Sequence, residues 1–198
     1  MSNLLILGAG QFGMMVREIA ESTKKYSKID FLDDANPIAV GKLQNVMSFV
    51  GKYEYAIVAI GNPGIRQMYT DKVREHFKIA TLTSPNAYVS PSAVIGKGSI
   101  IEPMAVIQTG AILGDGCIVS SGAVVRHNAT VGSYCHLDCN SVVVSNAVVP
   151  IGTKIEIGST YINDSRDINK KEFDMHIKVP KGGPESIDGE EYNFDSVM

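Results

Sequence analysis

The second half of the chain repeats every six residues. From Val89 to Thr160 an aliphatic residue opens each hexad and a small residue follows four positions later, through twelve hexads without an insertion. A helix has a period of about 3.6 and an ordinary strand a period of two, so a period of six fits neither. The pattern predicts a parallel β-helix in which each hexad supplies one short strand and a corner. The aliphatic positions are Val89, Ile95, Ile101, Ile107, Leu113, Val119, Val125, Val131, Leu137, Val143, Val149 and Ile155.

Three hexads should form one triangular coil, so residues eighteen apart should stack at the ~4.8 Å spacing of paired strands. Twelve hexads then give about four coils, with the aliphatic residues inside. The flat sides of such a prism suit packing against further copies of the chain. Met104, Ile112 and Val144 occupy outward positions and are apolar, so we expect the prism to self-associate.

Before the repeat, strands alternate with helices. Apolar runs at residues 4–7, 29–32 and 56–60 predict three strands, and residues 79–82 a short fourth. Amphipathic segments between them predict two helices. One begins at Met14, and the other follows a Gly-Asn-Pro-Gly turn and ends at His76. Such alternation is typical of a parallel sheet with short crossovers. The fold class is therefore α/β followed by β.

Three parts follow from this change of pattern. We expect a Rossmann-like domain over residues 1–84, a β-helix over residues 85–162 and a non-repeating tail over residues 163–198.

A glycine-rich turn joins the first strand to the first helix. Gly8, Gly10 and Gly13 form a GxGxxG pattern, which lets a phosphate approach the backbone at a helix N-terminus. Asp33 and Asp34 follow the second strand and could accept hydrogen bonds from a ribose or sugar hydroxyl. The module has about half the size of a full dinucleotide fold, which favours a mononucleotide or sugar nucleotide over NAD. A tight turn without a ligand is the alternative.

Composition narrows the partners. A net charge of −3 without a basic cluster argues against nucleic acid. The first ten residues lack a basic leader, and Gly8 interrupts their apolar run, so we expect no signal peptide or membrane span and a cytoplasmic protein. The three cysteines include no CxxC pair, and no metal site is expected. Cys117 and Cys135 occupy small interior positions eighteen apart and should be stacked fillers.

The two halves in this order resemble the sugar O- and N-acetyltransferases of the sialic-acid and bacillosamine type. The resemblance extends from Leu4 to about Ile162. It rests on the segments LLILGAGQFG, FLDD, VAIGNPGIR, NAYVSPSAVIGKGSII and GAVVRHNATVGSYCH. It implies a left-handed β-helix, a homotrimer, acetyl-CoA bound between adjacent prisms and a nucleotide sugar bound by the N-terminal domain.

The resemblance also implies roles for individual residues. The family's general base falls on His127, and a second family histidine, which contacts the acyl donor, falls on His136. A turn whose backbone N–H holds the thioester carbonyl falls on Ser145 and Asn146, where relatives have Ser-Gly. Asn128 stands where relatives carry Asp or Glu beside the base. Acetylation of an amine or a hydroxyl needs a base that works near neutral pH, which suits histidine.

Two other functions fit parts of the pattern. A non-catalytic trimeric scaffold that binds a nucleotide sugar is favoured by Asn128 and by the shortness of the repeat. A nicotinamide-dependent oxidoreductase is favoured by the GxGxxG turn alone, and no substrate domain follows that turn. The residues do not choose between N- and O-acetylation.

Overall fold

The computed structural model describes residues 2–162, and the predicted tail over residues 163–198 lies outside them. Its N-terminal unit is a four-stranded parallel sheet in the order β2-β1-β3-β4. The strands are β1 (Ser2–Leu7), β2 (Tyr26–Leu32), β3 (Tyr55–Val58) and β4 (Lys78–Ile79). Strand β1 lies in the middle and is buried from Leu4 to Leu7, which explains its continuous apolar run.

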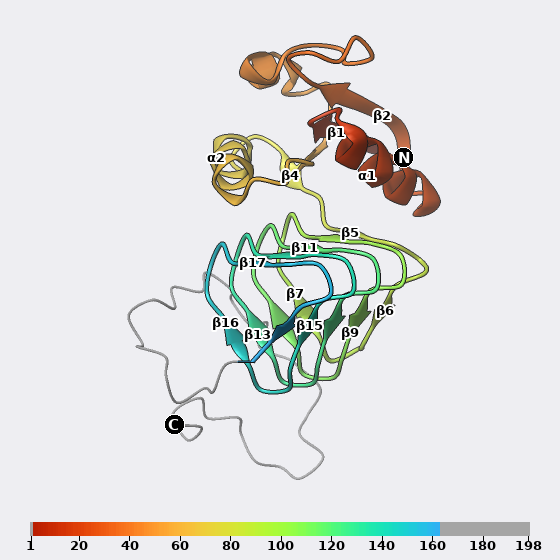
Figure 1. Ribbon diagram of the computed structural model, residues 1–198. Helices are drawn as coiled ribbons and strands as arrows, with labels where there is room; N and C mark the ends of the chain where they lie inside the picture. The colour runs from red at the N-terminus through yellow and green to blue at the C-terminus, as the bar shows by residue number, and fades with distance from the viewer. Residues whose placement is uncertain (1, 163–198) are drawn as a thin grey trace.

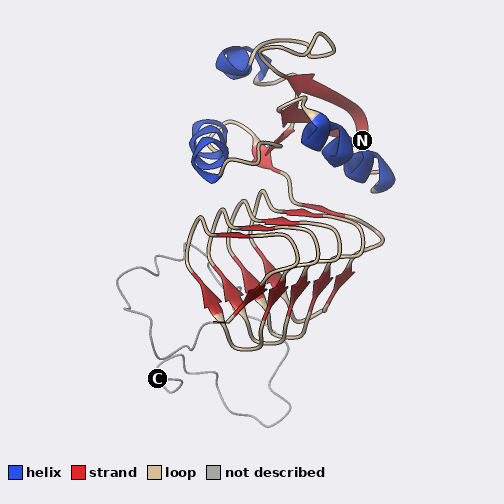
Figure 2. Ribbon diagram, in the orientation of Figure 1, coloured by secondary structure: helices blue, strands red, loops and turns tan. Residues whose placement is uncertain are grey.

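Helices cover both faces of this sheet (Figures 1 and 2). Helix α1 (Gln11–Ser22) packs Val16 and Ile19 against the face that carries Phe31. The short 3-10 helix η1 (Leu43–Phe49) and helix α2 (Pro63–Val73) cover the other face. Helix α2 begins where Asn62 accepts a hydrogen bond from the N–H of Ile65. Side chains alternate between the two faces along β1, so both sides of the sheet are buried.

The rest of the described chain is a triangular prism of two-residue parallel strands (Figure 1). We call its three sheets the first, second and third faces. The first face contains β5 (Leu82–Thr83), β8 (Ile100–Ile101), β11 (Ile118–Val119), β14 (His136–Leu137) and β17 (Lys154–Ile155). The second contains β6 (Tyr88–Val89), β9 (Val106–Ile107), β12 (Val124–Val125), β15 (Val142–Val143) and β18 (Thr160–Tyr161). The third contains β7 (Val94–Ile95), β10 (Ile112–Leu113), β13 (Thr130–Val131) and β16 (Val148–Val149).

The period of six therefore predicts the prism correctly. Stacked strands pair at a separation of eighteen residues, as in Val124 opposite Val106 and Val142. The second residue of most strands and the small corner residue fill one continuous core. Three parallel sheets of short strands are typical of the left-handed β-helix.

The start of the prism differs from the prediction. The fourth N-terminal strand was expected over residues 79–82, but two separate strands occupy this stretch. Lys78–Ile79 pairs with β3, whereas Leu82–Thr83 already pairs with β8 in the prism. The sequence pattern hides this first prism strand because Thr83 occupies a position that is aliphatic in the later hexads.

One further position repeats with the same period. Every sixth residue from 98 to 158 has a positive φ, between 57° and 77°. Glycine and asparagine adopt this left-handed conformation most readily. The eleven residues are Gly98, Met104, Gly110, Gly116, Gly122, Asn128, Tyr134, Asn140, Asn146, Gly152 and Gly158. The corners of the prism therefore explain where most of its asparagines and glycines stand.

The N-terminal unit lies against the first face of the prism (Figure 1). Leu82, Ile100 and Ile118 point outward from that face, yet each is at most 1% exposed. Leu82 and Ile100 join the apolar cluster that includes helix α1. The corner between the second and third faces is the edge opposite this contact. No helix within residues 2–162 is long and apolar enough to cross a membrane.

Candidate active site

The glycine-rich turn is built tightly except at one position. Gly8 has φ +108°, and a Cβ there would lie 2.7 Å from the carbonyl oxygen of Ala59. A Cβ on Gly13 would lie 2.1 Å from the oxygen of Gly8. Gly10 is different, because a Cβ on it would meet no atom within 4 Å. The fold itself therefore requires Gly8 and Gly13, whereas Gly10 leaves open space at the N-terminus of α1.

The two predicted acidic residues both bind backbone N–H groups of their own unit. Asp33 accepts from Ala9 at 2.8 Å and from Ala35 and Asn36 at 2.9 Å. These three bonds hold the pKa of the Asp33 carboxyl below its ordinary value. Asp34 accepts from the N–H of Leu43 at 3.1 Å. Asp33 thus ties the glycine turn to the loop after β2.

The strand order marks a crevice beside this turn. The chain leaves β1 for β2 on one side and later places β3 on the other side, so the carboxyl ends of β1 and β3 form a topological switch point. The Gly8 turn follows β1, and Gly61 follows β3. A Cβ on Gly61 would also meet nothing within 4 Å. Ligands of open α/β sheets bind at such points. Gly61 is therefore a candidate binding position that the sequence analysis missed.

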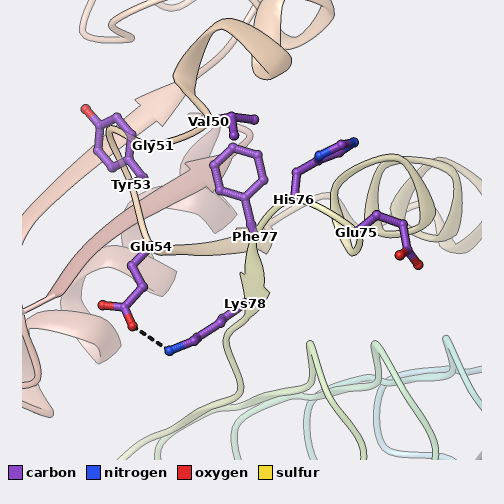
Figure 3. Close-up of a pocket in the computed structure, with 8 residues that line it drawn as sticks. All are labelled: Val50, Gly51, Tyr53, Glu54, Glu75, His76, Phe77 and Lys78. Atoms are coloured by element: carbon purple, nitrogen blue, oxygen red, sulfur yellow. Dashed lines mark hydrogen bonds and ion pairs between the residues drawn. The ribbon is translucent and has the colours of Figure 1, made fainter.

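A hollow of about 630 Å³ lies at the opposite ends of the strands (Figure 3). Glu54 immediately precedes β3, and Phe77 immediately precedes β4, so this hollow is at the amino ends of the strands. An ion pair of 2.7 Å between Glu54 and Lys78 borders it. It contains neither the Gly8 turn nor Gly61, so it is separate from the crevice at the carboxyl ends of the strands.

His127 lies at the corner between the second and third faces, in the turn from β12 to β13. Its side chain is exposed. As the stacking of eighteen residues predicts, Ser145 lies on the next coil, with its Oγ 3.2 Å from Nδ1 of His127. The His127 N–H donates to Oε1 of Gln108 at 3.1 Å, a contact that the sequence analysis missed. This histidine is therefore held at both its backbone and its ring while the rest of the ring faces solvent.

The neighbouring residues Asn128 and Asn146 form left-handed corners of the prism. Asn128 and Asn146 have φ of 57° and 60°, so the unusual turn expected at Ser145-Asn146 is present. The Asn146 N–H donates to the carbonyl of His127 at 3.2 Å. Within residues 2–162, the Ser145 N–H donates to no protein oxygen. Of these two N–H groups, the one of Ser145 is available to a ligand.

His136 is placed differently. It opens β14 on the first face, beside the N-terminal unit, and its Nε2 lies 3.2 Å from Oγ of Ser120. Partial burial lowers the pKa of His136, because desolvation disfavours the imidazolium. The first face is opposite the corner that carries His127. A single prism therefore does not bring His127 and His136 together.

The cysteines behave as packing residues. Cys117 and Cys135 are fully buried in the prism core. Burial raises the pKa of both thiols, that of Cys135 to about 11. Across residues 2–162 there is no group of three or more His, Cys, Asp or Glu that could hold a metal ion.

Two segments of the chain match known protein families. Residues 3–73 match the model of the PglD N-terminal domain, and residues 92–127 match the bacterial transferase hexapeptide model of six repeats. The acetyltransferase domain of PglB from Neisseria gonorrhoeae FA1090, solved in complex with acetyl coenzyme A, is 32% identical to the chain. The match has a TM-score of 0.76 and covers 80% of this chain and 81% of that one. The chain belongs to the PglD-like family of sugar N-acetyltransferases with hexapeptide repeats.

Two other relatives match the chain. The UDP-N-acetylbacillosamine N-acetyltransferase of Bacillus subtilis (strain 168) is 29% identical over 117 residues, which are 51% of this chain and 51% of that protein. The match thus spans about half the length of this curated relative. The perosamine N-acetyltransferase of Caulobacter crescentus, solved as a mutant with CoA and GDP-perosamine, has a TM-score of 0.70 at 20% identity. That match covers 83% of this chain and 90% of that one, and it shows the shared fold.

Membership of the PglD-like family answers two questions that the residues left open. The family is one of sugar N-acetyltransferases, so nitrogen is favoured over oxygen as the acceptor atom. The GxGxxG turn belongs to the segment that matches the PglD N-terminal domain, which removes the reason for expecting a nicotinamide-dependent oxidoreductase.

Proposed function

We propose that this chain transfers the acetyl group of acetyl-CoA to the amino group of a nucleotide-linked sugar, for the synthesis of a glycan. Two comparisons support the substrates. The gonococcal relative binds acetyl coenzyme A, and the relative from Bacillus subtilis is named for a UDP-linked amino sugar. The single observation that carries the proposal is the exposed His127 ring, fixed by Ser145 on a prism of this family.

His127 acts as the general base. With the Nδ1–H donating to Ser145, the Nε2 lone pair faces the solvent side, where an acceptor amine can lie. As the amine nitrogen bonds to the thioester carbonyl carbon, Nε2 takes the proton that the nitrogen loses. The C–S bond then breaks, and His127 returns that proton to the departing thiolate of coenzyme A. The acetyl group therefore passes directly from sulfur to nitrogen, and no acyl-enzyme forms.

Ser145 also contributes its backbone. Its N–H is the donor that no protein oxygen takes within the described residues, and it stabilises the oxygen of the thioester carbonyl as negative charge develops there. Asn146 holds the turn in its left-handed conformation and donates its own N–H to the carbonyl of His127. The side chain of Ser145 orients the base, and its N–H binds the acetyl group.

The acceptor nucleotide occupies the crevice between the Gly8 turn and Gly61. Gly10 allows its phosphates to approach the N-terminus of α1, whose first N–H groups and helix dipole favour an anion. Gly8, Gly13 and Asp33 shape the turn. Asp34 and the remaining lone pair of Asp33 face the sugar or ribose hydroxyls.

The active site forms between copies of the chain in a homotrimer. The nucleotide crevice and His136 lie on the side of the first face, whereas His127 lies on the opposite edge. A base and a nucleotide that act together must therefore come from different copies. The outward rows beside the His127 corner are apolar and partly exposed in one chain, as at Val106, Val124 and Ile112. A neighbour that covers these rows buries them and brings its His136 to the acetyl-CoA beside His127.

The direct experiment mixes the purified chain with acetyl-CoA and a panel of UDP- and GDP-linked amino sugars. Release of free thiol shows transfer, and mass spectrometry of the sugar shows where the acetyl group went. We expect thiol release only with an amino sugar present, and a product one acetyl group heavier. The same panel with the amines replaced by hydroxyls is the control. Absence of thiol release with every amino sugar would leave the non-catalytic scaffold as the better account.

A further inference from the structure

Arg66 is the most deeply buried charged residue of the described chain. It lies in helix α2 and is 0% exposed. Every hydrogen bond that its guanidinium donates among residues 2–162 goes to a backbone carbonyl oxygen, and none goes to a carboxylate. Burial without a counter-ion lowers the pKa of the guanidinium. Burying a guanidinium without a counter-ion costs folding free energy. The carbonyls that Arg66 binds therefore indicate what the residue does.

The carbonyls belong to three separate segments. Nη1 donates to Ile60 at 2.9 Å and to Gly61 at 2.7 Å, in the loop after β3. Nε donates to Gly116 at 2.7 Å, on one coil of the prism. Nη2 donates to Tyr134 at 2.6 Å, on the next coil. The planar guanidinium offers five N–H donors at set angles, so one side chain fixes all three segments relative to one another.

One of these segments is a wall of the nucleotide crevice. Ile60 and Gly61 lie in the loop that follows β3, and a Cβ on Gly61 would meet no atom within 4 Å. Gly8 packs directly against Ala59 at the end of the same strand. The other two segments are prism coils, and the prism carries the proposed catalytic histidine. Arg66 therefore joins the part that holds the nucleotide to the part that holds the base.

We propose that Arg66 is a positioning residue, which fixes the Gly61 wall of the nucleotide crevice on the prism and so aims the bound sugar at the base of the neighbouring copy. The proposal rests on the proposed function. Arg66 touches neither substrate. Its loss should impair binding and turnover of the nucleotide sugar while leaving acetyl-CoA binding intact, because misplacement of a reactant by about 1 Å can cost about 100-fold in rate.

The test compares Arg66→Lys with a matched control at the C-terminal end of the same helix. Arg74 also links the end of α2 to the prism, through Asp115 at 3.3 Å, and none of its hydrogen bonds or ion pairs within residues 2–162 goes to residues 60–61. Arg74→Gln therefore removes an inter-unit contact without touching the crevice. Calorimetry with the nucleotide sugar and with acetyl-CoA, together with kcat and KM for each, separates the two variants. Melting temperature and oligomeric state are recorded for both.

For Arg66→Lys we expect affinity for the nucleotide sugar to fall about tenfold and kcat to fall as well, with acetyl-CoA affinity within about twofold of the parent. Arg74→Gln should match the parent in every one of these constants. The proposal is overturned if Arg66→Lys keeps its affinity for the nucleotide sugar. It is also overturned if that variant loses both substrates equally, since a merely structural role predicts that result.

A second measurement covers the case in which Arg66→Lys does not fold. The Nε–H resonance of Arg66 in the parent protein should shift when UDP or GDP is added, because the ligand contacts the Gly61 wall, and should stay in place when acetyl-CoA is added. No shift with either nucleotide would contradict the proposal. This readout needs no turnover, so failure of the acetyl transfer assay alone would sink the proposed function and leave the Arg66 proposal open to its own test.

Discussion

His127 and Ser145 lie on successive coils of the prism, with Nδ1 of the ring 3.2 Å from Oγ of the serine. In the family pattern a carboxylate stands beside the base, but this chain has Asn128 there, and the left-handed turn at that corner uses Asn128 with a φ of 57°. The hydroxyl one coil away therefore supplies the partner that orients the ring.

Ser145→Ala should lower kcat about fivefold without changing the melting temperature by more than a degree or two, because one hydrogen bond to an exposed ring is worth about 1 kcal/mol. Ser145→Thr keeps the hydroxyl and the backbone N–H, so it should recover most of the rate. Steady-state kinetics on the two variants checks the pair. An alanine variant with the parent's kcat would show that Ser145 does not orient the base.

Gly10→Leu should fold as the parent does, because a Cβ on Gly10 meets no atom within 4 Å. It should lose affinity for the nucleotide sugar, because we expect the phosphates to approach the helix at this position. Gly8→Ala is the contrast. Its φ of +108° and the oxygen of Ala59 at 2.7 Å should destabilise the fold by about 1–3 kcal/mol. Thermal unfolding and calorimetric titration distinguish these effects. Equal affinity for the nucleotide sugar in Gly10→Leu and the parent would remove the crevice from this turn.

Mixing two inactive variants tests whether the site forms between copies. His127→Ala lacks the base and Gly10→Leu lacks the nucleotide crevice. Unfolded together and refolded as mixed trimers, they should regain about a quarter of the parent activity, since about one interface in four then combines two intact halves. If every site belonged to a single chain, the mixture would stay as inactive as either variant alone.

The pH dependence of stability should carry a contribution from His136. Burial lowers its pKa in the folded protein, whereas in the unfolded chain the pKa returns to about 6.5. Below about 6.5 the unfolded state therefore binds the proton more readily, and stability falls as the pH falls from there to the folded-state value. His136→Asn should remove this loss. Melting curves between pH 8 and pH 5 test it, and parallel curves for parent and variant would contradict it.

Most of the prism could be predicted from the sequence, because each hexad repeats the same local requirement. The eighteen-residue stacking predicts Ser145 beside His127 from the sequence alone. The role of Asn128 could not be seen in the same way, since the requirement for a left-handed residue appears only when the corners are superimposed. The strand at Leu82–Thr83 was missed because its interior position is a threonine.

Contacts between the two units could not be predicted. Arg66 appears in the sequence as one charged residue on an amphipathic helix, and its partners at Gly116 and Tyr134 lie 50 and 68 residues away. All of them are backbone carbonyls, which no residue pattern records. Asp33 was predicted as a ligand for a sugar hydroxyl, and its three backbone partners became visible only when the loop after β2 was placed beside the glycine turn.

Whether His127 is the base of an acetyl transfer to a sugar amine is tested by a single rate. That rate is the thiol release by His127→Ala with acetyl-CoA and the amino sugar that the parent prefers, on protein shown by light scattering to keep the parent's oligomeric state. We expect a kcat lower by a factor of about 10² to 10⁴, because loss of a general base typically lowers the rate by that much. A kcat equal to the parent's would contradict it.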